Sequence, residues 1–167
     1  MASQNYLGIY ICKDTAVAVC LDSQGKDGNV LGCFSVSVEA QEHPANPDMS
    51  ALASLIAHGC AERGLTFSEV AVALDCAMFM QHSVHSEFDD PKQIAATVRF
   101  DTEEALATDI TDVALAFKVN STDRAGSQLT VFTAQRKILS DILHSLQQHN
   151  LDPVTIEPDV NLSLIHI

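Results

Sequence analysis

The sequence predicts an α/β protein with a mixed sheet, and three observations carry this prediction. An apolar, β-branched stretch at 7–21 is interrupted by Lys13-Asp14, and a second strand-like stretch follows at 30–39. A helical pattern comes next at 48–64, and then a continuous apolar run at 70–74 that suits a strand covered on both faces. The order strand, strand, strand, helix, strand is typical of a layered α/β domain.

The local signals support each of these elements. In the second stretch Phe34, Val36 and Val38 alternate with polar residues, which is the period of a half-buried strand. The predicted helix has Asp48 as its N-terminal cap and Gly64 at the position of its C-terminal cap. One face of this helix carries apolar or small residues: Leu52, Leu55, Ile56 and Gly59.

Beyond Leu74 the pattern predicts a second group of elements, which leaves the first layer. A strand is expected over 79–88, and Asp90-Pro91 is a strong start signal for a helix that continues to 106, with Ile94, Val98 and Asp101 on one stripe. A strand at 113–119 and a second at 129–133 are expected next, separated by a polar loop at 120–128. A helix at 135–149 and a final strand at 154–156 follow.

Composition limits the possible functions. Of the 167 residues 47% are hydrophobic and 19% charged, so the chain has enough apolar material for a packed core and is not expected to be disordered. The formal net charge is −13, and no run of Lys or Arg relieves it locally. Because such a surface repels phosphate backbones, we expect no nucleic-acid partner. Neither a signal peptide nor a membrane-spanning helix is indicated.

The five cysteines, at 12, 20, 33, 60 and 76, are scattered and form no C-x-x-C pair. We therefore expect no disulfide framework and no metal site, and interpret them as small core residues in a reducing cytoplasm. The acidic pairs Asp89-Asp90 and Glu103-Glu104 are interpreted as a helix cap and a solvated helix face rather than acid–base groups. No nucleophile or metalloprotease motif occurs, so no catalytic residue is predicted.

The ordered set of patterns resembles the first half of actin-like, ribonuclease H-like proteins of the PilM type. The resemblance is carried by Tyr6-Leu7-Gly8-Ile9-Tyr10-Ile11 as the opening strand and by 70–74 as the strand before an inserted small subdomain. It continues with 90–103 and 112–117 inside that subdomain, and with 129–136 and 151–159 as the return to the main layer. The cytoplasmic part of the GspL proteins of type II secretion shares this architecture.

The resemblance implies a division of the chain. Residues 1–76 would form the first part of the main subdomain, 77–150 an inserted strand-helix-strand-strand-helix subdomain, and 151–161 the return to the main subdomain. The abrupt apolar ending at 162–167 is interpreted as a non-native tail on a fragment that lacks the second half of the fold. A natural short helix or strand is the alternative for this tail.

The resemblance also implies where a nucleotide would bind. Actin-like sites need Asp-x-Gly after the first strand, the Asp to hold magnesium and the Gly to let amides approach the phosphates. Here Tyr10 and Cys12 stand at those positions. Only Lys13 and Asp14 remain as a degenerate phosphate loop. We therefore expect no cofactor, although ATP with magnesium is the alternative.

By the same resemblance, the chain is a scaffold rather than an enzyme. It would lie in the cytoplasm, at the inner-membrane platform of a type IV pilus or type II secretion machine, and contact the membrane through its partners. There it would bind the cytoplasmic tail of a PilN-like protein, and it could also form a homo-oligomer. The residues expected to meet that tail are Phe88, Ile94, Val98 and Phe117, with a core role as the favoured alternative. The rival functions are an ATP-dependent enzyme of the sugar-kinase and actin superfamily and an α/β domain without an assignable function.

Overall fold

The computed structural model of the chain describes residues 5–22, 28–38 and 48–160. The expected loop at 40–47 and the tail at 162–167 lie outside these residues. The chain divides into two compact units, the first formed by 1–76 and 140–167 and the second by 77–139. The predicted inserted subdomain ran to 150, whereas this division assigns most of the last helix to the first unit.

The first unit is built on a five-stranded sheet with the order β3-β2-β1-β4-β8. β2 (Thr15–Asp22) pairs in antiparallel fashion with β1 (Asn5–Cys12) on one side and with β3 (Asn29–Ser37) on the other. The predicted tight turn at Lys13-Asp14 joins β1 to β2. β4 (Glu69–Leu74) and β8 (Pro153–Pro158) extend the sheet parallel to β1. The three parallel strands therefore end at the same edge of the sheet, which positions the candidate site described below.

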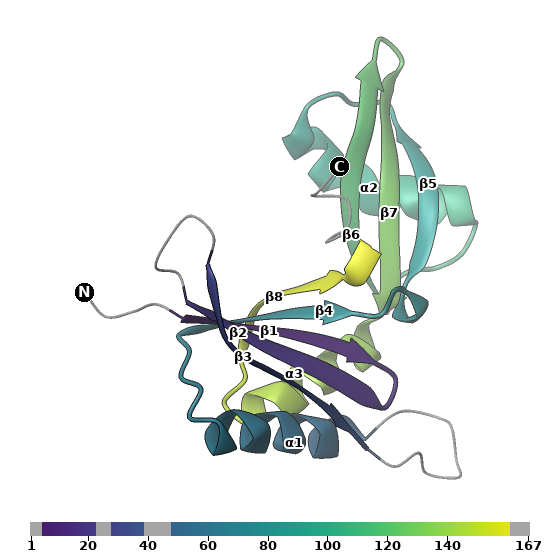
Figure 1. Cartoon of the computed structure of the whole chain (residues 1–167). Helices are drawn as coiled ribbons and strands as arrows, with labels where there is room; N and C mark the ends of the chain where they lie inside the picture. Colours follow the sequence, from purple (N-terminus) through teal and green to yellow (C-terminus); the bar gives the residue numbers. More distant parts are fainter. Residues whose placement is uncertain (1–4, 23–27, 39–47, 161–167) are drawn as a thin grey trace. The chain divides into compact units, whose positions relative to one another are not determined.

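Two helices, α1 (Met49–Glu62) and α3 (Arg136–Gln148), lie on the same side of this sheet (Figure 1). Alternate residues of β1 point into the core on that side, and Leu7, Ile9 and Ile11 are almost completely buried. Asp48 caps α1 as predicted, accepting a hydrogen bond from the Ala51 amide at 2.9 Å. Of the residues predicted to share one face of α1, Leu52 and Ile56 are fully buried, while Leu55 is 38% exposed.

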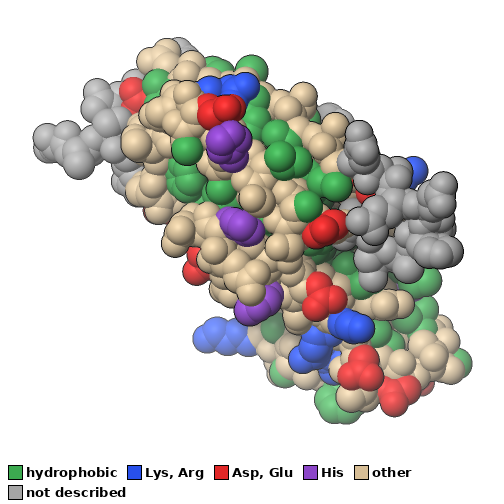
Figure 2. Space-filling model, turned by 90° about the horizontal axis from the view of Figure 1, so that it is seen from below, with side chains coloured by type: hydrophobic (Ala, Val, Ile, Leu, Met, Phe, Trp, Pro, Cys, Tyr) green, Lys and Arg blue, Asp and Glu red, His purple; other side chains and the backbone are tan. Residues whose placement is uncertain are grey.

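The opposite side of the sheet carries no helix among the described residues, and its side chains are mainly apolar. Tyr6, Leu21 and Val30 are cross-strand neighbours there and are all exposed. A shallow cavity of about 260 Å³ lies over the middle of this face. In contrast, Figure 2 shows the molecule from below, where hydrophobic side chains are scattered among acidic, basic and histidine side chains.

The second unit is a three-stranded antiparallel sheet with the order β5-β7-β6, packed against α2 (Pro91–Leu106). Its strands are β5 (Met80–Ser86), β6 (Val113–Asp123) and β7 (Gly126–Gln135), and a short 3-10 helix (Cys76–Met78) precedes β5. The core of this unit consists of five buried aliphatic residues: Val84, Ile94, Val98, Leu129 and Val131. Ile94 and Val98, predicted on one stripe of α2 with Asp101, are buried together with Thr102, whereas Asp101 is half-buried.

The polar loop predicted over 120–128 is mostly strand, since β6 and β7 continue toward each other and turn at Arg124-Ala125. Gly126 makes this tight return possible. Its φ of 123° lies in a region that other residues rarely adopt, and a Cβ there would collide with the carbonyl oxygen of Ser86. Polar composition suggested a loop here, but β6 is exposed over this end, so polar side chains suit a strand there equally well.

No helix of the described residues is long and apolar enough to cross a membrane.

Candidate functional site

A cluster of polar side chains lies at the edge where β1, β4 and β8 end. Cys12 is the last residue of β1, Asp75 and Cys76 follow β4 directly, and Asp159 follows β8 directly. Because parallel strands bring their carboxyl ends to one edge, residues separated by more than 140 positions become neighbours. We call Cys12, Asp75, Cys76 and Asp159 the strand-end cluster.

Hydrogen bonds tie the strand-end cluster together. The Cys12 thiol donates to Asp75 Oδ2 at 2.7 Å, and the Cys76 amide donates to Asp159 Oδ1 at 3.1 Å. The Tyr10 hydroxyl donates a longer bond of 3.4 Å to Asp159 Oδ2. One ligand atom each from Asp75, Cys76 and Asp159 lies within 4.8 Å of the other two. The carboxylates of β4 and β8 thus share one small site.

The negative charges of the cluster affect its proton-bearing groups. Burial, followed by a hydrogen bond with Cys12, raises the pKa of Tyr10 to about 12. The hydrogen bond to Asp75 is the main cause of the raised pKa of the Cys12 thiol, while desolvation and then the charges of Asp159 and Asp75 raise the pKa of Cys76. At neutral pH both thiols are therefore protonated and poor nucleophiles, so the cluster is better suited to binding a cation than to nucleophilic attack.

The predicted degenerate phosphate loop, Lys13 and Asp14, forms the hairpin turn between β1 and β2. Lys13 is exposed and has a φ of 49°, and the carbonyl oxygen of Asp14 accepts the Val38 amide at 2.8 Å. The hydrogen bond with Asp75 leaves the pKa of the Cys12 thiol raised overall, although the charge of Lys13 acts to lower it. The carboxylates gathered at this edge come from Asp75 and Asp159 instead.

Sequence reasoning missed Asp75 and Asp159, and its prediction of buried cysteines was correct for only two of the five. Cys20 and Cys60 are buried as expected, but Cys33 and Cys76 are exposed and Cys12 is half-buried. The available signal was an Asp directly after each of two strands, in Ala-Leu-Asp and Glu-Pro-Asp. Polar residues directly after parallel strands often line ligand sites, since the strand ends converge.

The residues predicted to meet a partner belong to the core of the second unit. Ile94 is fully buried and Val98 is 4% exposed. Phe88 and Phe117 are partly buried and pack against the same core. The structure therefore gives Ile94 and Val98 the core role that was the alternative, and they offer no surface to a tail.

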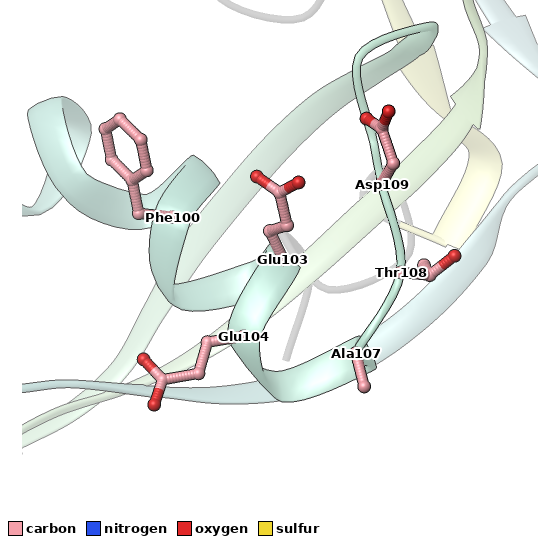
Figure 3. Close-up of a pocket in the computed structure, with 6 residues that line it drawn as sticks. All are labelled: Phe100, Glu103, Glu104, Ala107, Thr108 and Asp109. Atoms are coloured by element: carbon pink, nitrogen blue, oxygen red, sulfur yellow. The ribbon is translucent and has the colours of Figure 1, made fainter.

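The second unit has a different exposed feature at the C-terminal end of α2. A shallow pocket of about 540 Å³ is lined by side chains from α2 and the loop after it: Phe100, Glu103, Glu104, Ala107, Thr108 and Asp109. Figure 3 shows Phe100 on the helix and the carboxylate of Asp109 on the loop, with that of Glu103 between them. Phe100 is 70% exposed. We call this the Phe100 pocket.

The comparisons with known proteins identify the fold. No family profile matches the sequence, and no curated protein matches it. Among solved structures, the "PilM-PilN type IV pilus biogenesis complex" matches with a TM-score of 0.79 and 19% identity, over 96% of this chain and 49% of that one. The cytoplasmic domain of EpsL, an inner-membrane component of the type II secretion system of Vibrio cholerae, matches with a TM-score of 0.62 and 20% identity, over 94% and 58%.

A third match is a protein of Bacteroides thetaiotaomicron with an actin-like ATPase fold and unknown function, at a TM-score of 0.53 and 8% identity, over 99% of this chain and 56% of that one. The chain therefore has the actin-like α/β fold, in the arrangement found in PilM- and GspL-like proteins, as the sequence predicted. It spans about half the length of these solved structures.

Proposed function

We propose that the chain is part of a scaffold subunit in the inner-membrane platform of a type IV pilus or type II secretion machine, and that it binds the cytoplasmic tail of a PilN-like membrane protein. The observation that carries this proposal is the match to the PilM–PilN complex over 96% of the chain. The match to the EpsL cytoplasmic domain supports the same class of machine. On this proposal the protein is cytoplasmic and reaches the membrane through its partner.

The chemistry of the first hairpin supports binding without catalysis. A nucleotide site of the actin type needs a carboxylate and a glycine after the first strand, but Tyr10 and Cys12 stand there. Lys13 and Asp14 serve as the hairpin turn. The proposed function therefore uses the fold as a rigid frame that presents surfaces to other proteins.

The Phe100 pocket is the surface on which we place the tail within the second unit. An exposed aromatic side chain is a typical anchor in protein interfaces, and Glu103, Glu104 and Asp109 around it favour a segment with basic residues. The carboxyl end of α2 adds partial negative charge of the same sign. We therefore expect the tail to combine an apolar side chain with Lys or Arg.

The test is fluorescence anisotropy with a labelled peptide of the PilN-like protein's cytoplasmic tail. We expect saturable binding that weakens about tenfold or more for Phe100→Ala, because interface anchors typically contribute more than about 1.4 kcal/mol. Met80→Ala is the matched control, since Met80 is 66% exposed in the same unit but lies outside the pocket. Saturable binding with equal loss in both variants would contradict the pocket, and absence of binding would contradict the scaffold assignment.

Nucleotide binding is the second candidate function, and one observation favours it. Asp75 and Asp159 place two carboxylates at the carboxyl ends of parallel strands, a common location for ligands in α/β proteins. Titration of the chain with magnesium and ATP would decide this point. Binding that is lost in Asp159→Asn but kept in Asp89→Asn would support a nucleotide site, whereas no binding at millimolar ATP would remove this candidate.

A further inference from the structure

We propose that the strand-end cluster is a binding site for a four-coordinate transition-metal ion of the zinc type, with Asp75, Cys76 and Asp159 as ligands and the Cys12 thiolate as the fourth. This inference goes beyond the proposed scaffold function and does not depend on it. It rests on the position and the donor atoms of these four side chains, on the spacing of Asp75, Cys76 and Asp159, and on the hydrogen bond between Cys12 and Asp75.

The position is determined by rigid elements. Each of the three parallel strands delivers its last or following residue to the same edge, and ladder pairing holds them in register, with Ile11 opposite Leu74 and Leu74 opposite Pro158. The Asp75 amide also donates to the Ile11 carbonyl at 2.9 Å, which extends the pairing of β1 and β4 into the site. Metal sites built on strands rather than on long loops are held more precisely.

The spacing is close to that of a ligated metal. Ligand atoms of Asp75, Cys76 and Asp159 lie within 4.8 Å of one another. Bonds of about 2.0 Å to oxygen and 2.3 Å to sulfur in a tetrahedron require separations of about 3.5 Å between ligand atoms. Side-chain rotation can supply a contraction of this size, because Cys76 is exposed and its side chain is not packed in the core.

The donor atoms decide which metal fits. Two thiols and two carboxylates form a mixed sulfur and oxygen set, which suits a tetrahedral zinc-type ion. Magnesium prefers six oxygen ligands in an octahedron and has little affinity for sulfur. When the ion binds, it takes the place of the proton that the Cys12 thiol donates to Asp75 Oδ2. Cys12 and Cys76 each release one proton to the buffer when their sulfur becomes a thiolate ligand.

Charge and outer-shell contacts are consistent with a cation at this edge. Asp75 and Asp159 place two carboxylates in the cluster, and their negative charge favours a cation there. The Tyr10 hydroxyl and the Cys76 amide donate to the two oxygens of Asp159, which fixes the orientation of that carboxylate. Such outer-shell hydrogen bonds orient ligands in metal sites.

The experiment uses cobalt(II) as a spectroscopic probe, followed by competition with zinc, on the full chain in a reductant that does not bind metals. We expect a thiolate-to-cobalt charge-transfer band together with visible bands of tetrahedral coordination, both removed by about one equivalent of zinc. Cys76→Ser is expected to weaken zinc binding at least about tenfold, and Tyr10→Phe about tenfold through the outer shell. Cys12→Ser should reduce the charge-transfer band without abolishing it.

Cys33→Ser is the matched control, because Cys33 is an exposed cysteine of the same sheet that lies outside the cluster. The proposal is overturned if no charge-transfer band forms, or if Cys33→Ser removes the band while Cys76→Ser keeps it. Circular dichroism of each variant checks folding, and Asp159→Asn gives a second, cysteine-free test. Displacement of cobalt by millimolar magnesium would also contradict the proposal, since it would indicate a site made of oxygen ligands alone.

Discussion

Ser86 and Ser127 face each other across β5 and β7, and both are only 1% exposed. Their hydroxyl groups nevertheless differ. The Ser127 hydroxyl shares a hydrogen bond of 3.0 Å with Thr122, whereas Ser86 Oγ has no partner among the described residues. A buried polar atom without a partner costs free energy, because it loses its hydrogen bonds to water.

We therefore predict opposite effects for two identical substitutions. Ser86→Ala should leave the free energy of unfolding unchanged or raise it by up to about 1 kcal/mol, since it removes an unsatisfied group. Ser127→Ala should lower it by about 1 kcal/mol, since it leaves Thr122 without this bond. Urea denaturation of the two variants measures the difference, and a larger loss for Ser86→Ala would refute the prediction.

Asp109 provides a second prediction at the scale of single residues. Hydrogen bonds from the hydroxyl of Thr111 (2.6 Å) and from its amide (2.7 Å) hold the pKa of Asp109 below its usual value. The pKa of Asp109 is therefore lower in the folded than in the unfolded protein, so its ionised carboxylate stabilises the folded state. This stabilisation is fully present at a pH above the pKa of the unfolded protein and is lost as the pH falls through the pKa of the folded protein. Acid should therefore weaken this loop as Asp109 becomes protonated.

Thr111→Val removes the hydroxyl donor, and we expect the pKa of Asp109 to rise toward its usual value. NMR titration of the Asp109 carboxyl measures this shift directly. Thr108→Val is the matched control, because it makes the same chemical change one residue before Asp109, whereas the hydrogen bonds that lower the pKa of Asp109 come from Thr111. A pKa of Asp109 that moves equally in both variants would count against the proposed cause.

At the scale of elements, α2 shows how a short motif determines where a helix begins. Asp90 accepts hydrogen bonds from the amides of Lys92 (3.0 Å) and Gln93 (3.1 Å), and Pro91 occupies the first helical turn. At the other end, Ala107 has a φ of 49° and its amide donates to the carbonyl oxygen of Glu104. Both ends of the helix are therefore defined by local hydrogen bonds.

We predict that Asp90→Ala lowers the free energy of unfolding by about 1 kcal/mol, within the usual range for N-terminal caps. Asp90→Asn should retain most of this energy, because an amide oxygen can accept the same bonds. Asp89→Ala is the control, since the hydrogen bonds from the first turn of α2 are accepted by Asp90 and not by this neighbour. Thermal melts followed by circular dichroism measure the three variants, and equal losses for Asp89→Ala and Asp90→Ala would contradict the capping role.

The β6–β7 hairpin shows where local signals are insufficient. Residues 120–128 are polar, so composition predicts a loop, yet most of them extend the two strands. Arg99 illustrates the tertiary influence in the same unit. Its guanidinium donates to the carbonyl oxygens of Ile110 (2.7 Å) and Val113 (3.0 Å), and so ties the loop after α2 to the helix.

For the whole molecule, net charge is the dominant electrostatic property. The formal charge is −13, and the ion pairs of Glu62 with His58 and Arg63 lie on the exposed surface. Such exposed pairs contribute little to stability. Self-repulsion between the remaining acidic groups therefore opposes the compact state at low ionic strength.

We expect the melting temperature to rise by about 2–4 °C between 0.01 and 0.15 M sodium chloride, since the screening length falls from about 30 to 8 Å. The double variant Glu104→Lys, Asp141→Lys replaces two exposed acidic side chains and should reduce this salt dependence. Differential scanning calorimetry measures both. A melting temperature that is independent of salt, or the same salt dependence in the variant, would show that self-repulsion is not important.

The sequence by itself determined the order of the elements, the mixed α/β class and the actin-like fold. Apolar periodicity, the caps at Asp48 and Asp90, and the turn at Lys13-Asp14 are local signals, and each depends on residues only a few positions apart. The same local signals could not locate the strand-end cluster. Asp75 and Asp159 are separated by more than 80 residues and meet only because β4 and β8 are paired in parallel.

The tertiary structure also decided the roles of residues that the sequence left open. Ile94 and Val98 are core residues because α2 packs on β5 and β7, whereas Phe100, on the same helix, is exposed on its other side. The cysteines likewise separate by packing: Cys20 in β2 and Cys60 in α1 are buried, whereas Cys33 in β3 and Cys76 after β4 are exposed. Burial and convergence depend on packing between distant segments, and this information is absent from any short window of the sequence.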